Sequence, residues 1–294
     1  MESNLVDFCC PVCDHAEYHV IRESTLGNSP PDLGYRFTPS HLRVYRIVKC
    51  RACGHMYCSP RPKGISGQYI DVEDAEYLNN EAQRLATAQK VVRILQKYKK
   101  AGRLLDVGCS TGDFLRVATQ CYDVEGVELS KWASGIAKKR GLTIHELLLS
   151  ELGSAKSFDV VTLWGVIEHL EDPKKEINEI FRLMKDNGIL CIWTGNVDSI
   201  TARLFGRKWW YFMGQHIQYF SEATLHYLLK RCGFRKIVVR NYPYVLSMAS
   251  VANSIGRYPL ISKLFSGILR SRALSSATIT FALPGEMFAI YRKI

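Results

Sequence analysis

Two pairs of closely spaced cysteines near the start of the chain have the spacing of metal ligands. The pairs are Cys10-Pro-Val-Cys13 and Cys50-Arg-Ala-Cys53, and 36 residues separate them. Two thiolates on one short turn reach one face of a tetrahedral ion, so two pairs predict a closed, structural Zn²⁺ site. The alternatives are four buried cysteines without a metal, or a set in which a neighbour replaces one ligand. The neighbours that could do so are Cys9, His15, His41, His55 and Cys58.

A glycine-containing loop lies between a predicted strand and a predicted helix. It reads Asp106-Val-Gly108-Cys-Ser110-Thr-Gly112. Glycine allows a sharp turn and lets a ligand approach the main chain, which favours nucleotide or cofactor binding. Glu128 follows about 20 residues later, at the end of the next predicted strand, where a carboxylate can accept hydrogen bonds from ribose hydroxyls. Dinucleotide-dependent enzymes use a similar loop, so this pattern alone leaves the cofactor open.

Three further side chains have the chemistry of general acids and bases. Glu168 and His169 follow a predicted strand, and His216 lies in Gly-Gln-His-Ile-Gln-Tyr-Phe. Histidine titrates near neutral pH, which suits the removal of a proton from a hydroxyl or an acidic carbon. The structural alternatives are that His169 packs at a helix start, that His216 steadies its loop, and that Glu168 orients His169. An aromatic run at residues 209–212 is either core or a surface on which a sugar ring stacks.

The pattern around these residues is strand, loop and helix, repeated. Short apolar runs predict strands at residues 104–107, 124–127, 158–163 and 189–193, with two closing antiparallel strands at 236–240 and 287–292. Apolar residues at helical spacing predict helices at residues 73–100, 113–120, 130–140 and 173–184. Alternating strands and helices predict an α/β fold, in which a mostly parallel sheet binds ligands at the carboxyl ends of its strands.

Four sequence motifs follow one another along this region. They are the glycine loop in residues 104–114, the acid in 127–130, the Glu-His pair in 157–173, and the turn and strand of 183–190. Together they closely resemble the motifs of the class I S-adenosylmethionine-dependent methyltransferases, over about residues 103–240. Residues 218–225 fit as well, whereas Ser110 stands where many members have glycine. The cysteine pairs joined to this core resemble the subgroup that methylates sugars and other small metabolites.

The resemblance implies a Rossmann-like sheet of seven mostly parallel strands, with S-adenosylmethionine as the cofactor. The residues it assigns to the cofactor are Asp106, Gly108, Ser110 and Gly112 for methionine, Glu128 for ribose, Leu129 for adenine, and Trp164 and Gly165 for the sulfonium and its methyl group. Methyl transfer is an in-line displacement, so the protein mainly holds the acceptor near the methyl carbon. A base is needed only if the acceptor loses a proton, and the candidate catalytic residues are His216, His169 and Glu168.

Composition and charge narrow the class of protein. The chain has 294 residues, 47% of them hydrophobic, which excludes intrinsic disorder, and no apolar run has the ~20 residues of a membrane span. The first residues lack the features of a signal peptide, so we expect a cytoplasmic protein whose ten cysteines are reduced. The net charge of +11 favours anionic partners: nucleic acid, acidic lipid or phosphorylated small molecules.

The sequence predicts a zinc-ribbon module at residues 1–62, a linker near 60–64, and a methyltransferase domain at 70–294. Within that domain, residues 103–240 form the predicted cofactor-binding core, and residues 243–285 form a predicted helical insertion before the last strand. Residues 250–273 combine apolar and basic side chains at helical spacing. This segment either covers the substrate or a dimer interface, or lies on a membrane surface as a peripheral contact.

The function expected from these features is methyl transfer to a small molecule, a sugar or glycan precursor, with phosphate or nucleotide attached to suit the basic charge. Two other classes remain. An RNA methyltransferase would use the basic surface and the zinc ribbon, but residues 164–167 read Trp-Gly-Val-Ile instead of the Asn-Pro-Pro-Tyr-type turn of enzymes that methylate base amino groups. A non-catalytic binding module would keep the fold as a scaffold. We therefore do not expect nucleic acid as the partner.

Overall fold

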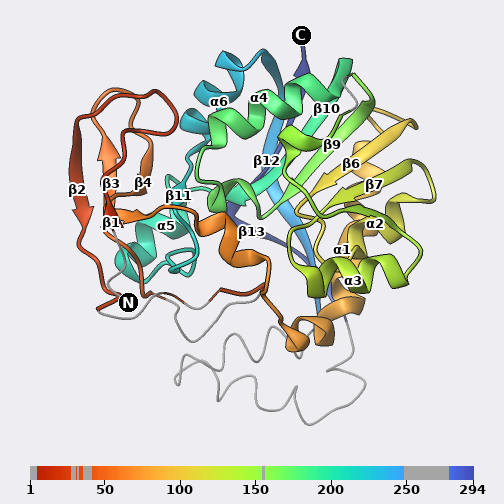
Figure 1. Cartoon of the computed structure of the whole chain (residues 1–294), viewed down its shortest axis with the longest axis horizontal. Helices are drawn as coiled ribbons and strands as arrows, with labels where there is room; N and C mark the ends of the chain where they lie inside the picture. The colour runs from red at the N-terminus through yellow and green to blue at the C-terminus, as the bar shows by residue number, and fades with distance from the viewer. Residues whose placement is uncertain (1–4, 28–30, 32, 36–41, 154–155, 248–277) are drawn as a thin grey trace.

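A large sheet flanked by helices fills the right of the molecule, and a small sheet lies at its left (Figure 1). This computed structural model describes every residue except 1–4, 28–30, 32, 36–41, 154–155 and 248–277. Among the described helices none combines the length and the apolar character needed to cross a bilayer.

The large sheet has seven strands in the order β12-β13-β10-β9-β6-β7-β8. They are β6 (Arg103–Val107), β7 (Asp123–Val127), β8 (Thr143–His145), β9 (Phe158–Trp164), β10 (Met184–Gly195), β12 (Phe234–Ser247) and β13 (Thr278–Lys293). Each adjacent pair in the run β10-β9-β6-β7-β8 is parallel. β13 is antiparallel to both of its neighbours, β10 and β12. This topology confirms the predicted Rossmann-like, mostly parallel sheet.

Helices cover both faces of the large sheet, and each face has its own apolar core. One core joins the sheet to α1 (Glu81–Leu95), α2 (Asp113–Ala118) and α3 (Lys131–Lys139). The other joins it to α4 (Pro173–Leu183) and α6 (Glu222–Arg231). The carboxyl ends of β6, β7 and β9 therefore meet at one edge, between these two layers, as a parallel sheet requires.

Local sequence sets where several of these helices begin. Ser130 accepts a hydrogen bond from the backbone of Ala133 at the start of α3, and Asp172 does the same for Lys175 at the start of α4. Pro173 at the first position of α4 has no N–H to leave unsatisfied. Such caps fix the loops that end at the sheet edge, because each loop runs directly into a capped helix.

The small sheet has the order β11-β4-β3-β2 and is antiparallel. Its strands are β2 (Tyr18–Arg22), β3 (Ile47–Cys50), β4 (Met56–Cys58) and β11 (Gln218–Tyr219), and beside it β1 (Leu5–Val6) pairs with β5 (Arg61–Pro62). β11 comes from the second half of the chain and pairs Gln218 with Tyr57. The predicted module at residues 1–62 is therefore completed by a strand from the predicted methyltransferase domain.

The remaining helical segments are short. They are α5 (Ile200–Phe205) and the 3-10 helices Ile65–Tyr69, Ala75–Asn80, Leu149–Glu151, Ile167–His169 and Gly206–Lys208. The single helix predicted at residues 73–100 is wrong in its bounds. Asp74 caps a 3-10 turn instead, by accepting a hydrogen bond from Tyr77, and α1 begins only at Glu81, after two asparagines, which are weak helix formers.

The prediction of a helical insertion at residues 243–285 is wrong at both ends of that range. Residues 243–247 and 278–285 continue β12 and β13, whose pairing extends to Ser247 opposite Thr278. On β12, Tyr242 stacks on Trp193 of β10 and Tyr244 contacts the same ring edge-on, and this aromatic packing favours strand over helix there. The basic amphipathic segment predicted at residues 250–273 lies outside the described residues.

Candidate active site

The glycine loop between β6 and α2 has a left-handed backbone at three positions. Gly108, Ser110 and Gly112 have φ angles of 69°, 50° and 79°. A Cβ atom on Gly108 would come within 2.6 Å of Val166 Cγ2, because the loop after β9 packs directly on this turn. Glycine is therefore required at Gly108 by conformation and by packing. A serine at position 110 meets only the conformational cost of about 1 kcal/mol.

Glu128 lies at the end of β7 and is buried, with its carboxylate directed into hydrogen bonds with the glycine loop. The backbone N–H of Ser110 donates to Oε2 at 2.8 Å, and that of Ser130 donates to Oε1 at 2.8 Å. The hydroxyl of Tyr35 also donates to Oε1, at 3.1 Å. Burial raises the pKa of Glu128, and the two backbone donors oppose that shift. The carboxylate thus holds the loop in place and still has lone pairs for further donors.

Asp106, the last acid of β6, is also buried at the same edge. Its Oδ1 accepts a hydrogen bond from the hydroxyl of Thr162 at 2.6 Å. Burial raises its pKa to about 8, and the nearby charge of Glu128 adds to the shift, while the Thr162 hydroxyl opposes it. Two buried acids beside one loop give a site whose electrostatics favour a ligand that carries positive charge.

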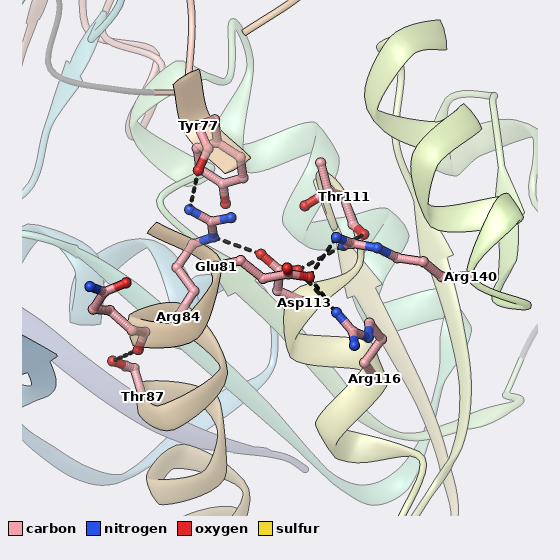
Figure 2. A network of polar contacts seen from close by, with 9 residues as sticks. Tyr77, Glu81, Arg84, Thr87, Thr111, Asp113, Arg116 and Arg140 are labelled. Carbon is pink, nitrogen blue, oxygen red and sulfur yellow. Dashed lines mark hydrogen bonds and ion pairs between the residues drawn. The ribbon is translucent and has the colours of Figure 1, made fainter. Parts of the chain in front are cut away.

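A network of charged side chains joins the glycine loop to the neighbouring helices (Figure 2). Asp113, at the start of α2, accepts from Arg84 of α1 and from Arg140 after α3, with both contacts at 2.7 Å. Arg140 also donates to the backbone carbonyl of Thr111 at 2.6 Å and to Glu81 at 2.6 Å. Three helices are therefore tied to the backbone of the loop, which fixes its position relative to the sheet.

Four buried polar atoms in or around the loop have no hydrogen-bond partner within the described residues. They are Ser110 Oγ, Thr111 Oγ1, Arg84 Nη2 and Trp164 Nε1. Buried polar atoms are normally satisfied, so unpaired ones at a loop of this kind fit a bound ligand with polar groups. The guanidinium and indole N–H groups suit a carboxylate, and Glu128 suits hydroxyls. The donors and acceptors here fit an amino acid joined to a nucleoside, as in S-adenosylmethionine.

The other residues predicted for the cofactor lie at the same edge. Trp164 ends β9, and its ring packs against Phe114 of α2 and Phe288 of β13, at centroid distances of 4.9 and 6.0 Å. Gly165 has a φ of 67°, and a Cβ there would lie 3.0 Å from the ring of Trp193. Leu129 is half-buried after β7. Their assignments to sulfonium, methyl group and adenine stay predictions.

Glu168, His169 and His216 come together next to the glycine loop. One potential ligand atom from each of the three lies within 4.8 Å of the others, and the two imidazole rings have centroids 4.8 Å apart. The hydroxyl of Tyr69 lies 2.9 Å from His169 Nδ1, and the charges of Glu168 and Glu128 both raise the pKa of Tyr69, whose burial raises it most. Tyr69 therefore lies between this cluster and Glu128.

Burial keeps this cluster neutral or weakly charged. Glu168 accepts from the hydroxyls of Thr194, at 3.0 Å, and Tyr211, and burial raises its pKa to about 7. Burial lowers the pKa of His169 to about 4 and that of His216 well below its usual value. Both rings are therefore uncharged at neutral pH, each with one protonated and one unprotonated nitrogen.

Tyrosines from the N-terminal part of the chain complete the site, and sequence reasoning missed them. Tyr35 reaches Glu128, Tyr69 reaches His169, and the ring of Tyr77 lies 3.6 Å from the guanidinium carbon of Arg84. Their partners are up to 100 residues away in sequence. No local signal identifies them, because an isolated tyrosine in a linker has no pattern that distinguishes it from any other.

The aromatic run at residues 209–212 belongs mainly to the core. Trp209 and Tyr211 are buried, and they pack with Val44, Ile47 and other residues of the small sheet. Tyr211 contacts the site through its hydroxyl on Glu168, and through its carbonyl and its ring on His216. Of the two predicted roles, the structure therefore favours the core.

The four predicted zinc ligands converge at the end of the small sheet. Sγ of Cys10 lies 3.5 Å from Sγ of Cys53, and Sγ of Cys13 lies 3.5 Å from Sγ of Cys50. Tetrahedral Zn²⁺ with bonds of ~2.3 Å separates its sulfur ligands by about 3.8 Å, so the cluster fits the ion. Of the predicted substitutes, Cys58 and His55 are buried outside the cluster. The Cys58 thiol donates a hydrogen bond to the carbonyl of His216, and Nε2 of His55 contacts the side-chain oxygen of Gln218. Cys9 and His15 are exposed outside the cluster, and His41 lies outside the described residues.

A family described as a methyltransferase domain matches residues 77–239, which is more than half of the chain. The matched range runs from Tyr77 to Val239 and includes the glycine loop, Glu128 and His216. The chain belongs to this methyltransferase family. The family and the class I fold both support S-adenosylmethionine as the cofactor.

Individual relatives match between about a third and a half of the chain. An uncharacterized protein of Methanocaldococcus jannaschii is 27% identical over 154 residues, which cover 50% of this chain and 71% of that protein. A ubiquinone biosynthesis O-methyltransferase of Paraburkholderia phymatum is 36% identical over 118 residues, 36% of this chain and 51% of that enzyme. The chain thus spans about half the length of the latter.

The fold is also shared with solved structures. A SAM-dependent methyltransferase from Archaeoglobus fulgidus superimposes with a TM-score of 0.52 and 18% identity, covering 75% of this chain and 100% of that one. The likeness extends over the whole of that chain and shows that the fold is shared.

Proposed function

We propose that this methyltransferase transfers a methyl group to a hydroxyl of a small molecule. The observation that carries the proposal is the buried cluster of Glu168, His169 and His216 beside the glycine loop. S-adenosylmethionine supplies an electrophilic methyl group, so the protein has to orient the acceptor and remove its proton. A neutral, buried histidine next to the cofactor site provides an acceptor for that proton.

The residues around the loop would hold the cofactor. Glu128 would accept hydrogen bonds from the ribose hydroxyls, and Asp106 would face the positively charged amino group of the methionine part. Thr111 and Arg84, each with an unpaired buried donor, would bind its carboxylate. This arrangement is supported by the chemistry of the donors and acceptors, since each buried atom gains a partner of opposite character.

His216 is the proposed proton acceptor. Its Nδ1 lies 2.8 Å from the carbonyl of Tyr211, which can only accept, so the ring proton lies on Nδ1 and the lone pair on Nε2. In the proposed step the acceptor oxygen forms a bond to the methyl carbon while the sulfur–carbon bond breaks. The hydroxyl proton passes to Nε2 of His216, and S-adenosylhomocysteine leaves with neutral sulfur.

The acceptor we propose is a sugar or glycan precursor that carries a phosphate or a nucleotide. The net charge of +11 supports an anionic substrate, and the ubiquinone relative named above is an O-methyltransferase. The aromatic run at residues 209–212 gives no separate support, because two of its rings are buried in the core.

We also propose that Cys10, Cys13, Cys50 and Cys53 hold a structural Zn²⁺. Four thiolates complete a tetrahedral shell and leave no position for a substrate, so this ion would stabilise the small sheet and take no part in chemistry.

The test is incubation of the purified protein with methyl-labelled S-adenosylmethionine and separate pools of sugar phosphates, nucleotide sugars and RNA. We expect label in a sugar pool and in a base-stable ether linkage. Label in RNA alone would overturn the substrate class, and absence of S-adenosylmethionine binding by calorimetry would overturn the function itself. His216→Asn should lower the turnover at least a hundredfold while the affinity for the cofactor changes little.

A further inference from the structure

The two histidines beside the glycine loop are oriented as metal ligands usually are. Nδ1 of His216 lies 2.8 Å from the carbonyl of Tyr211, and Nδ1 of His169 lies 2.9 Å from the carbonyl of Gln215. Each ring therefore carries its proton on Nδ1 and keeps a lone pair on Nε2. Within the described residues no group hydrogen-bonds either Nε2 atom, although His216 is only 5% exposed. Histidines that bind metals typically donate their other nitrogen to a carbonyl in this way.

A carboxylate lies beside these rings and is itself held in position. Glu168 is buried and accepts hydrogen bonds from the hydroxyls of Thr194 and Tyr211. Each oxygen has a lone pair beyond those two bonds. Two imidazoles, one carboxylate and a second layer of hydrogen bonds around each of them make up the common ligand set of catalytic divalent ions.

The spacing of the three residues suits one ion. One potential ligand atom from each residue lies within 4.8 Å of the others. Bonds of ~2.0–2.2 Å from a tetrahedral ion to nitrogen and oxygen place the ligand atoms about 3.3–3.6 Å apart. The side chains would therefore have to close by at most about 1.5 Å when the ion binds. Glu168 and His169 lie on one 3-10 turn, and the backbone N–H of Ile217, next to His216, donates to the carbonyl of Glu168 at 2.9 Å.

We propose that Glu168, His169 and His216 bind a first-row divalent cation such as Zn²⁺, Co²⁺ or Mn²⁺. This site is separate from the four cysteines, so the protein would hold two ions per chain. Three protein ligands leave coordination positions open, and an acceptor with adjacent oxygens could occupy them. The proposal rests on the proposed function, since the ion would orient and polarise the hydroxyl that is methylated.

A metal ion and a proton compete for the same lone pair on His216. With an ion bound, Nε2 is a ligand and cannot take the hydroxyl proton, which the ion instead makes acidic enough to leave to solvent. The metal-free protein would use His216 as described above. The two descriptions therefore predict different responses to chelators, and an experiment can separate them.

The experiment measures bound cobalt in the full-length protein after removal of metals and dialysis against Co²⁺. We expect two ions per chain in the wild type and in His19→Asn, whose exposed histidine on β2 belongs to neither cluster. His216→Asn and Glu168→Gln should each retain one ion, with the thiolate-to-cobalt absorption of the cysteine site intact. Thr194→Val, which removes a hydrogen bond to Glu168, should weaken the second ion about tenfold.

One ion per chain in the wild type, or the same two ions in His216→Asn and Glu168→Gln, would overturn the proposed site. If a variant does not fold, the wild type alone can test the second site. A bound substrate analogue should then protect the cobalt in that site against a chelator, and the cobalt absorption outside the thiolate band measures this protection. Calorimetry with S-adenosylmethionine separates the two proposals. If the wild type retains only one ion per chain and still binds the cofactor and transfers methyl groups, the proposed function stands and the second metal site is rejected.

Discussion

Glu128 is the residue on which the cofactor site depends most. Its carboxylate accepts from the backbone of Ser110 in the glycine loop and from Ser130 at the start of α3, so it links two segments and still faces the ligand position. Buried, charged hydrogen bonds are stronger than neutral ones, and an unpaired partner is costly.

Glu128→Ala should therefore weaken S-adenosylmethionine binding by about tenfold or more, which corresponds to the loss of hydrogen bonds to a charged group. Calorimetric titration measures the affinity, and circular dichroism checks that the fold is kept. Glu179→Ala is the matched control, because Glu179 lies on α4 and forms an ion pair with Arg182 of the same helix. Equal affinities in both variants would contradict the ribose assignment.

Asp106 should make cofactor binding depend on pH. Its pKa is raised to about 8, chiefly by burial, so it is protonated in the free protein at pH 6 and 7. A cationic amino group favours the ionised form, so binding must release this proton, and the affinity should increase as the pH increases towards 8. The gain should approach tenfold from pH 6 to pH 7, the limit for one coupled proton.

Titrations in buffers of different ionisation enthalpy measure both the affinity and the number of protons released. Asp106→Asn should remove the pH dependence even if it weakens binding. An affinity that is constant from pH 6 to pH 8, with no proton release, would show that Asp106 does not face the amino group.

At the level of elements, α1, α2 and α3 are tied together by the ion pairs of Asp113. Its side chain is 6% exposed, and those of Arg84 and Arg140 are 22% and 20% exposed, so these pairs are less screened than surface pairs (Figure 2). Neither arginine could find another acid of equal burial if Asp113 were removed, although Glu81 would remain beside Arg140.

Asp113→Ala should lower the free energy of unfolding by about 2 kcal/mol, less than for a fully buried pair because both arginines retain contact with water. Urea denaturation measures this difference. Breaking the more exposed pair of Glu222 and Lys236 with Glu222→Ala should cost under about 1 kcal/mol and provides the comparison. A loss of the same size in both variants would mean that the network in Figure 2 does not brace the loop.

At the scale of the whole molecule, the cysteine module and the catalytic part share a sheet. β11 pairs with β4, and its neighbour Ile217 donates to the carbonyl of Glu168 while accepting from the backbone of Cys58. His55 of the module contacts Gln218 at 3.0 Å. Disturbance of the cysteine cluster is therefore transmitted to the segment that contains His216.

Cys50→Ser should lose one zinc ion per chain and unfold at a lower temperature. Because β11 completes the small sheet, we expect faster amide hydrogen exchange at residues 216–219 as well as within the module. Cys9→Ser is the control, since Cys9 is exposed and lies outside the cluster. Unchanged exchange at residues 216–219 in a zinc-depleted protein would show that the module folds independently of the catalytic part.

The sequence alone determined the features that depend on short-range chemistry. Paired cysteines, a glycine loop between strand and helix, an acid at the end of the next strand, and capped helix starts are all set within a few residues. These patterns predicted an α/β fold with a mostly parallel sheet, and the resemblance that they carry implied seven strands. Asp106, Glu128 and the Glu168–His169 pair lie where β6, β7 and β9 end, and parallel strands end together at one edge.

Only the tertiary structure decided which distant side chains complete the site. Tyr35 on Glu128, Tyr69 on His169, and Tyr211 on Glu168 join residues that lie 93, 100 and 43 positions apart, and no local pattern indicates such pairs. The pairing of β4 with β11 and the extension of β12 to Ser247 have the same origin. Burial and cross-strand packing outweigh local preference there, because a two-residue strand or a buried hydroxyl gains its stability from partners that only folding supplies.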